Sequence, residues 1–210
     1  MMYLSSYRLG RHADLLRSAS GNGRAAIVFN ALDVYGDTRL RNWDREASDL
    51  STLGYDSEEL DLRQYVGDSA GLARRLAAID LVWVPGGNAF TLARAMTASG
   101  FGGAIGPAMD RGMIYAGYSA GACVAGPDLR GIHLMDDPDH IPEGYDAGMP
   151  AETLGLVPFR IVPHWRSDHP ETGRAEEAVR WLERHALDYR AIRDGEVVIV
   201  EDDGTVEVRS

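Results

Sequence analysis

The chain has 210 residues, of which 45% are hydrophobic and 25% are charged, as is typical of globular proteins. This composition excludes a disordered tail, a collagen-like fibre and a disulfide scaffold, and the length fits one domain, expected to span residues 1–210. The formal net charge of −11 disfavours contact with phosphate backbones and with anionic membrane surfaces. Neither nucleic acid nor a membrane is therefore expected as a partner.

The cysteine content and the apolar runs indicate a compartment. Cys123 is the only cysteine in the sequence, so no intramolecular disulfide can form, which fits a reducing environment. No apolar run is long enough to span a bilayer, and residues 1–11 lack the pattern of a secretory signal. We expect a cytoplasmic protein.

Short apolar runs alternate with amphipathic stretches along the chain. In chain order, we expect a strand at 3–6, a helix at 11–18, a strand at 25–30, a helix at 38–53, a weak strand at 59–62, a helix at 70–78, a strand at 80–84, a helix at 89–99, a strand at 113–117, a helix from 120, a strand at 159–162, a helix at 171–186, and strands at 189–192, 196–201 and 205–208. This alternation predicts an α/β fold with a doubly wound, mostly parallel sheet flanked by helices and a C-terminal antiparallel edge hairpin. The unpatterned segment 126–158 is long for a loop and is a candidate functional loop.

A candidate nucleophile follows the strand at 113–117. Residues 117–121 read Gly-Tyr-Ser-Ala-Gly, a G-x-S-x-G motif between a strand and a small-residue helix. In that context a sharp turn lifts Ser119 above the sheet, and the flanking glycines keep Cβ atoms out of a crowded backbone. The alternative is a small-residue turn that only packs a helix on the sheet. We favour Ser119 as a nucleophile.

A serine nucleophile needs a base and an orienting acid. Among six histidines, His164 directly follows an apolar strand and should lie on the same rim of the sheet as Ser119. For the acid, three aspartates lie between the two in sequence, at positions 136, 137 and 139, and spacing alone does not choose among them. The spacing of His164, Asp168 and His169 matches no common zinc pattern, so no metal is expected.

A second strand-to-helix turn carries Gly86, Gly87 and Asn88. Glycines allow backbone N–H groups to approach a substrate closely, which makes this turn, with Asn88, a candidate substrate-binding segment. Asn88 is also well placed as the N-cap of the next helix, and both roles are compatible.

Four motifs together resemble one family. The sequences VPGGNAFTL, YAGYSAGACVAGP, DDPDHIPEGYDA and IVPHW are similar, in order and approximate spacing, to those of peptidase E, the aspartyl dipeptidase family. The resemblance implies a class I glutamine amidotransferase-like fold in which serine replaces the elbow cysteine. It covers about residues 80–165 closely and the rest of the chain loosely.

Carried over by motif, the resemblance implies a catalytic triad with no cofactor. Ser119 is the nucleophile, His164 the general base and Asp136 the third member, with Asp137 as the alternative. The backbone N–H groups of Gly87 and Ala120 form the implied oxyanion hole. Arg174 is the nearest match to the arginine that reads an acidic substrate side chain, and Arg166 is the alternative.

The expected function is hydrolysis of small peptides, first among them dipeptides with N-terminal aspartate, by a monomer or homodimer. Two features depart from the family: the segment from Asp136 to His164 is several residues longer, and the substrate-reading segment differs. The alternatives are another amidase, a cyanophycinase-like β-aspartyl peptidase, and a non-catalytic binding module on the same fold. A glutamine amidotransferase is disfavoured because Ser119 stands where that class has cysteine, and an ordinary esterase because no HGGG-type motif precedes the elbow.

Overall fold

A computed structural model describes residues 1–18, 22–36 and 38–210. Its main sheet has seven strands in the order β3-β2-β4-β5-β1-β8-β9. The pairs from β3 to β1 are parallel, and β1–β8 and β8–β9 are antiparallel. The strands are β1 (Met2–Ser5), β2 (Gly23–Ile27), β3 (Tyr55–Glu59), β4 (Leu81–Val84), β5 (Ile114–Tyr118), β8 (Val197–Val200) and β9 (Val206–Arg209). The predicted α/β class and the C-terminal edge hairpin are confirmed.

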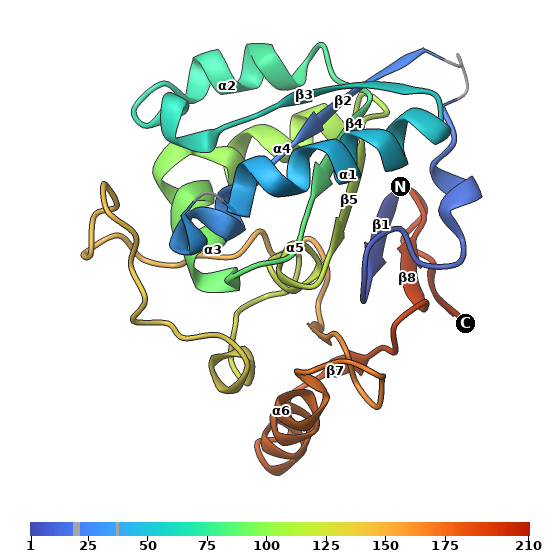
Figure 1. Cartoon of the computed structure of the whole chain (residues 1–210), viewed down its shortest axis with the longest axis vertical. Helices are drawn as coiled ribbons and strands as arrows, with labels where there is room; N and C mark the ends of the chain where they lie inside the picture. Colours follow the sequence, from blue (N-terminus) through green and yellow to red (C-terminus); the bar gives the residue numbers. More distant parts are fainter. Residues whose placement is uncertain (19–21, 37) are drawn as a thin grey trace.

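Helices cover both faces of this sheet (Figure 1). The helices of the described residues are α1 (Thr38–Thr52), α2 (Ser69–Leu76), α3 (Ala89–Ser99), α4 (Phe101–Met109), α5 (Ala120–Cys123) and α6 (Thr172–Arg184), with 3-10 turns η1 (Ala13–Leu16), η2 (Asn30–Tyr35), η3 (Leu62–Tyr65) and η4 (Ile132–Leu134). Of these, α6 lies beyond the sheet rather than on one of its faces. None of the helices in the described ranges is both long and apolar enough to cross a membrane.

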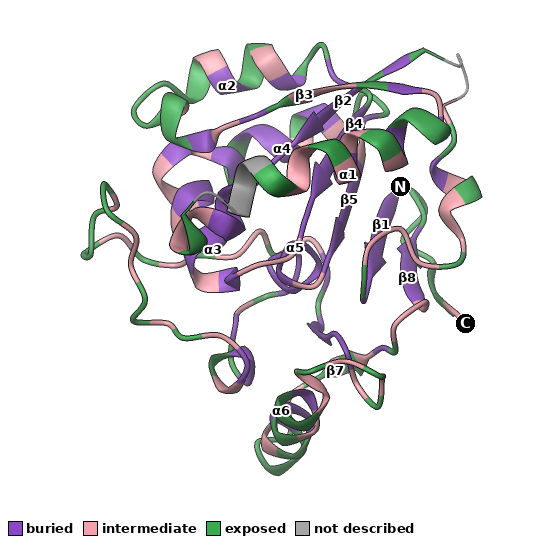
Figure 2. Cartoon of the chain, viewed as in Figure 1, coloured by how far each residue is buried: buried purple, intermediate pink, exposed green. Residues whose placement is uncertain are grey.

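The core is divided in two by the sheet. On β4, Val82 and Val84 face a cluster that contains residues of α2, α3, α4 and α5, whereas Leu81 and Trp83 face residues of α1 and η1. This alternation is the period of two that a strand imposes. Both sets are buried, which is why the sequence of β4, LVWV, reads as a continuous apolar run (Figure 2).

Several predicted elements differ from those observed. The helix expected at 11–18 is only η1, and the weak strand expected at 59–62 lies earlier, as β3. Helix α4 is not among the predicted elements, and the glycines and proline of FGGAIGPAM disfavour a helix. It forms nonetheless with Phe101, Ala104, Ile105 and Ala108 buried, so tertiary packing outweighs local propensity.

Two strands lie outside the main sheet. β6 (Arg160–Val162) pairs in parallel with β7 (Tyr189–Ala191), and α6 connects them. Figure 1 shows this β6-α6-β7 unit beyond the end of the sheet where β5 runs into α5. The segment 126–158 contains only η4 as regular structure among its residues, as expected for a long loop. The carboxyl ends of the parallel strands therefore face the β6-α6-β7 unit.

Candidate active site

Ser119 occupies a strained turn between β5 and α5. Its backbone φ is +50°, in a region that residues other than glycine rarely adopt. A Cβ on Gly121 would lie 2.0 Å from the Val84 carbonyl oxygen, and one on Gly117 would lie 2.9 Å from the Gly121 backbone. Glycine is thus required at both ends of the motif, and the turn holds Ser119 at the carboxyl edge of the sheet.

His164 is brought to Ser119 by the end of β6. Its backbone N–H donates to Ser6 Oγ at 2.7 Å, which ties it to the segment after β1, and its φ is +60°. The ring nitrogen Nε2 lies 3.1 Å from Ser119 Oγ, a hydrogen-bond distance. The structure thus brings together the two residues that the sequence pairs as nucleophile and base.

The acid beside His164 is Asp194, not Asp136. Asp194 Oδ1 lies 2.8 Å from His164 Nδ1 and also accepts a hydrogen bond from Ser6 Oγ at 2.7 Å. The Asp194 backbone N–H donates to Ser167 Oγ at 2.8 Å, so both the backbone and the carboxylate are fixed. In sequence, Asp194 and Gly195 indicate only a turn before β8. The one feature that could have pointed to Asp194 as the acid is its position just after the short strand β7.

The assignment of Asp136 as the third triad member is corrected by its contacts. Asp136 Oδ2 accepts a hydrogen bond from the backbone N–H of Ala89 at 2.8 Å, at the start of α3. Asp137, the alternative, is exposed, and its Oδ1 accepts from the Asp139 N–H. Desolvation raises the pKa of Asp136 to about 7, and the negative charge of Glu171 also raises it. Asp136 is therefore a neighbour of the site rather than the partner of His164.

The faces of the His164 ring are packed by other rings. His169 stacks on it with centroids 3.7 Å apart and planes within 8°, and Tyr7 meets it edge-on at 6.1 Å. Desolvation lowers the pKa of His164, the Asp194 hydrogen bond opposes this, and the charge of His169 lowers it further. A lowered pKa keeps the imidazole neutral near pH 7, as a proton acceptor requires.

The glycine turn after β4 lies against the nucleophile. A Cβ on Gly86 would lie 3.1 Å from Ser119 Cβ, and Gly87 has a φ of +147° where a Cβ would meet the Ala31 carbonyl. Asn88 is buried, caps α3 through the N–H groups of Phe90 and Thr91, and donates to the Asp137 carbonyl. The capping role of Asn88 is confirmed, and its amide has no exposed group for the expected substrate contact.

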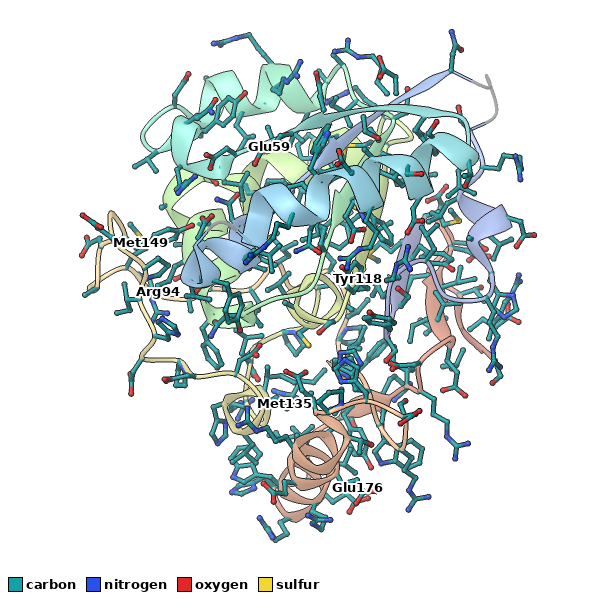
Figure 3. All side chains as sticks on the ribbon, viewed as in Figure 1. Glu59, Arg94, Tyr118, Met135, Met149 and Glu176 are labelled. Atoms are coloured by element: carbon teal, nitrogen blue, oxygen red, sulfur yellow. The ribbon has the colours of Figure 1, made fainter. Side chains whose placement is uncertain are left out.

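The two candidate arginines differ in placement. Arg174 NH1 donates to the Met135 carbonyl at 3.1 Å, and the Arg174 charge acts on Asp136, so this guanidinium lies beside the site. Met135, labelled in Figure 3, lies between the α5 region and α6. The guanidinium of Arg166 instead lies over the Trp165 ring, 4.5 Å from its centroid, and 4.0 Å from Glu176. Of the two arginines, Arg174 is thus the one whose guanidinium lies beside Asp136.

Three ligand-type side chains cluster here, although the sequence spacing predicted no metal site. His164, His169 and Asp194 offer nitrogen and oxygen atoms that lie within 4.8 Å of one another. However, both nitrogens of His164 face Asp194 and Ser119, and His169 Nδ1 accepts the Glu171 backbone N–H at 3.2 Å. An ion bound to His164 would have to replace one of the contacts to Ser119 and Asp194.

The sequence matches the family model for peptidase family S51 over residues 40–208. The chain belongs to peptidase family S51. Among curated relatives, it is 36% identical over 137 residues to a peptidase E of Streptomyces coelicolor, a match covering 63% of this chain and 53% of that protein. It is also 38% identical over 169 residues to a peptidase E of Citrobacter koseri, covering 79% and 66% of the two chains. The matches thus span about half to two thirds of these S51 relatives' length.

Solved structures confirm the S51 fold. A crystal structure of a peptidase E protein from Listeria monocytogenes superposes with a TM-score of 0.80 at 21% identity, covering 99% of this chain and 96% of that one. A peptidase from an acI-B1 Actinobacterium gives a TM-score of 0.66 at 17% identity, covering 94% and 81%. At these identities the likeness concerns the fold, which agrees with the predicted architecture.

Proposed function

We propose that this chain is a serine-type peptidase that hydrolyses small peptides through Ser119, His164 and Asp194. The observation that carries the proposal is the continuous chain of contacts from Ser119 Oγ to His164 Nε2 at 3.1 Å and from His164 Nδ1 to Asp194 Oδ1 at 2.8 Å. Nucleophile, base and orienting acid in this geometry are the requirements for acyl transfer at a serine. Membership of a peptidase family supports the same chemistry.

In the proposed reaction, Ser119 Oγ attacks the scissile carbonyl carbon while His164 Nε2 takes the hydroxyl proton. Asp194 holds the ring with its proton on Nδ1 and stabilises the imidazolium that forms. His164 then donates the proton to the leaving amine, and the acyl group stays on Ser119 until water, deprotonated by His164, releases it. Each proton therefore moves through one nitrogen, Nε2.

The negative charge of the tetrahedral intermediate needs donors on the opposite side of the carbonyl. We assign this role to the backbone N–H groups of Gly87 and Ala120. Ala120 is the first residue of α5, and the first N–H groups of a helix have no acceptor within it. The Gly86–Gly87 turn packs against Ser119, as its Cβ distances show. Loss of one such donor raises the barrier by about 3–4 kcal/mol.

For the substrate, dipeptides with N-terminal aspartate are the first candidates. The candidate cation for an acidic side chain is Arg174, whose charge lowers the pKa of Asp136 and whose guanidinium therefore lies beside the site. The net charge of −11 opposes long-range attraction of an acidic peptide, so this preference depends on Arg174 locally.

The test is hydrolysis of Asp-Leu, its β-linked isomer, Glu-Leu, Asn-Leu and Ala-Leu by wild type and Ser119→Ala, with chelator present. We expect cleavage of α-linked Asp-Leu by wild type and loss of at least a thousandfold in kcat for Ser119→Ala, with an unchanged circular dichroism spectrum. A Ser119→Ala protein of full activity would contradict the proposal. Cleavage of the β-linked isomer alone would instead indicate a cyanophycinase-like peptidase.

A binding module without chemistry is the remaining alternative. A fluorophosphonate probe distinguishes it, because the probe reacts with a serine activated by a base. Labelling of wild type at Ser119, absent in Ser119→Ala and His164→Ala, supports the enzyme. Absence of labelling in wild type, together with no hydrolysis of any peptide, supports the module.

A further inference from the structure

Glu171 lies at the opening of the proposed active site. It is the N-cap residue of α6, but its side chain makes no capping hydrogen bond to the helix. Its carboxylate Oε2 instead lies 3.9 Å from His164 Nε2, the nitrogen that contacts Ser119 Oγ, and 36% of its side chain is exposed. A half-exposed carboxylate thus stands beside the place where the scissile carbonyl must lie.

A substrate with a free N-terminus carries a cation close to this carboxylate. The α-ammonium group is bonded to the carbon adjacent to the carbonyl of the first residue. When that carbonyl is bound at Ser119, the ammonium must therefore lie within a few ångströms of the nucleophile. A carboxylate is the strongest ordinary hydrogen-bond acceptor for such a group. A blocked or internal residue would present a neutral amide there and leave the carboxylate without a counter-ion.

The charges around Glu171 favour a cation. The charge of Glu171 raises the pKa of Asp136 and that of Arg174 lowers it, so the three groups lie near one another. His164 is kept mainly neutral by desolvation. A positive group placed beside the Glu171 carboxylate is therefore attracted to it and also relieves its repulsion of Asp136.

We propose that Glu171 binds the free α-ammonium group of the substrate's first residue and restricts cleavage to the bond after it. This inference rests on the proposed function and names the feature that would make the enzyme an exopeptidase. Glu171 is a specificity-determining residue in this account, since it contacts the substrate and takes no part in proton transfer.

A different role for Glu171 would be to act through His164, whose pKa its charge raises. The two roles differ in measurable ways. Ammonium binding predicts a change in KM that depends on a free amine. An effect through His164 predicts a change in kcat and in the acid limb of the pH profile for every substrate.

The experiment uses Asp-Leu and Ala-Leu, each free and N-acetylated, with wild type, Glu171→Gln and Glu176→Gln. Glu176 is the matched control, because it lies on α6, 43% exposed, against Arg166 and Arg180. We expect wild type and Glu176→Gln to prefer the free peptides at least a hundredfold in kcat/KM. Glu171→Gln should raise KM for them at least tenfold, leave kcat within about threefold, and leave the N-acetyl forms unchanged.

Binding to Ser119→Ala by calorimetry gives the same answer without turnover. Ser119→Ala should bind the free peptide at least tenfold more tightly than its N-acetyl form, and adding Glu171→Gln should abolish the difference. Equal binding of both forms, or a Glu171→Gln enzyme with lowered kcat and unchanged KM, would overturn the inference. Failure of the proposed function would be recognised separately, as absence of Ser119-dependent hydrolysis and of fluorophosphonate labelling.

Discussion

Asp136 lies beside the proposed active site but does not contact its base, His164. Its oxygen accepts the first N–H of α3, while Asp194 takes the position at His164 Nδ1. The sequence motif around Asp136 predicts that Asp136 is the partner of His164, and it indicates no role for Asp194 other than a turn. Spacing predicts which residues share a rim of the sheet. It does not predict which of several carboxylates reaches a particular nitrogen, because that depends on where loops from distant strands meet.

The raised pKa of Asp136, about 7, makes a prediction about stability. The folded protein holds this proton more tightly than the unfolded chain, in which an aspartate titrates near 4. The stabilising effect of the protonated group is therefore present below about pH 4 and lost as pH rises toward 7. Asp136→Asn keeps the group neutral, so it should stabilise the protein by about 1–3 kcal/mol at pH 8 and by much less at pH 5.

Urea unfolding at the two pH values measures this difference. Asp137→Asn is the control, because Asp137 is the exposed neighbour of Asp136 in the same segment. An equal change at pH 5 and pH 8 for Asp136→Asn would show that burial does not govern this carboxyl group.

At the scale of elements, the strand-to-helix turns can be predicted from the sequence, whereas the short helix α4 cannot. The Gly-Tyr-Ser-Ala-Gly motif requires glycine because the backbones of β5, α5 and the end of β4 lie too close together to admit a Cβ atom. The sequence shows this crowding in the two glycines of the motif itself, Gly117 and Gly121. Helix α4 leaves almost no signature in the sequence, since its stability depends on burial of Phe101 and Ile105 rather than on its own propensity.

The same contacts predict opposite effects for two glycine-to-alanine changes. Gly121→Ala would place a Cβ 2.0 Å from the Val84 carbonyl oxygen, so it should destabilise the protein by at least 2 kcal/mol, roughly, and remove activity. Gly103→Ala, in α4, has open space around the new methyl group and should stabilise by about 0.5–1 kcal/mol. Thermal unfolding of both variants checks the pair. A Gly121→Ala protein as stable as wild type would show that the turn is less crowded than described.

At the scale of the whole molecule, the site is assembled from parts that are far apart in sequence. Ser119 follows β5 of the main sheet, His164 follows a strand of the second sheet, and Asp194 lies where the chain returns from β7 to β8. The Ser6 hydroxyl joins the last two, since it accepts from the His164 N–H and donates to Asp194. The alternation of strands and helices predicted the main sheet. It does not predict that β6 and β7 form a separate two-stranded sheet, because the sequence of a three-residue strand does not indicate which strand it pairs with.

The order of the three residues follows from that arrangement. In this chain they occur as Ser119, His164 and Asp194, whereas the sequence motifs predict the acid between the other two. His164 follows β6 and Asp194 follows β7, so the β6-α6-β7 unit, which stands beyond the carboxyl edge of the main sheet in Figure 1, supplies both the histidine and the acid. The proposed activity therefore depends on the docking of this unit as much as on the turn that holds Ser119.

The most direct test of this account is the kcat of Asp194→Asn on the peptide that wild type cleaves best. An asparagine keeps the shape but favours the wrong tautomer of His164 and does not stabilise its charged form. We predict a fall of about 10³–10⁴-fold in kcat, with the folded structure retained. A kcat within threefold of wild type would contradict the assignment of Asp194 and, with it, the proposed mechanism.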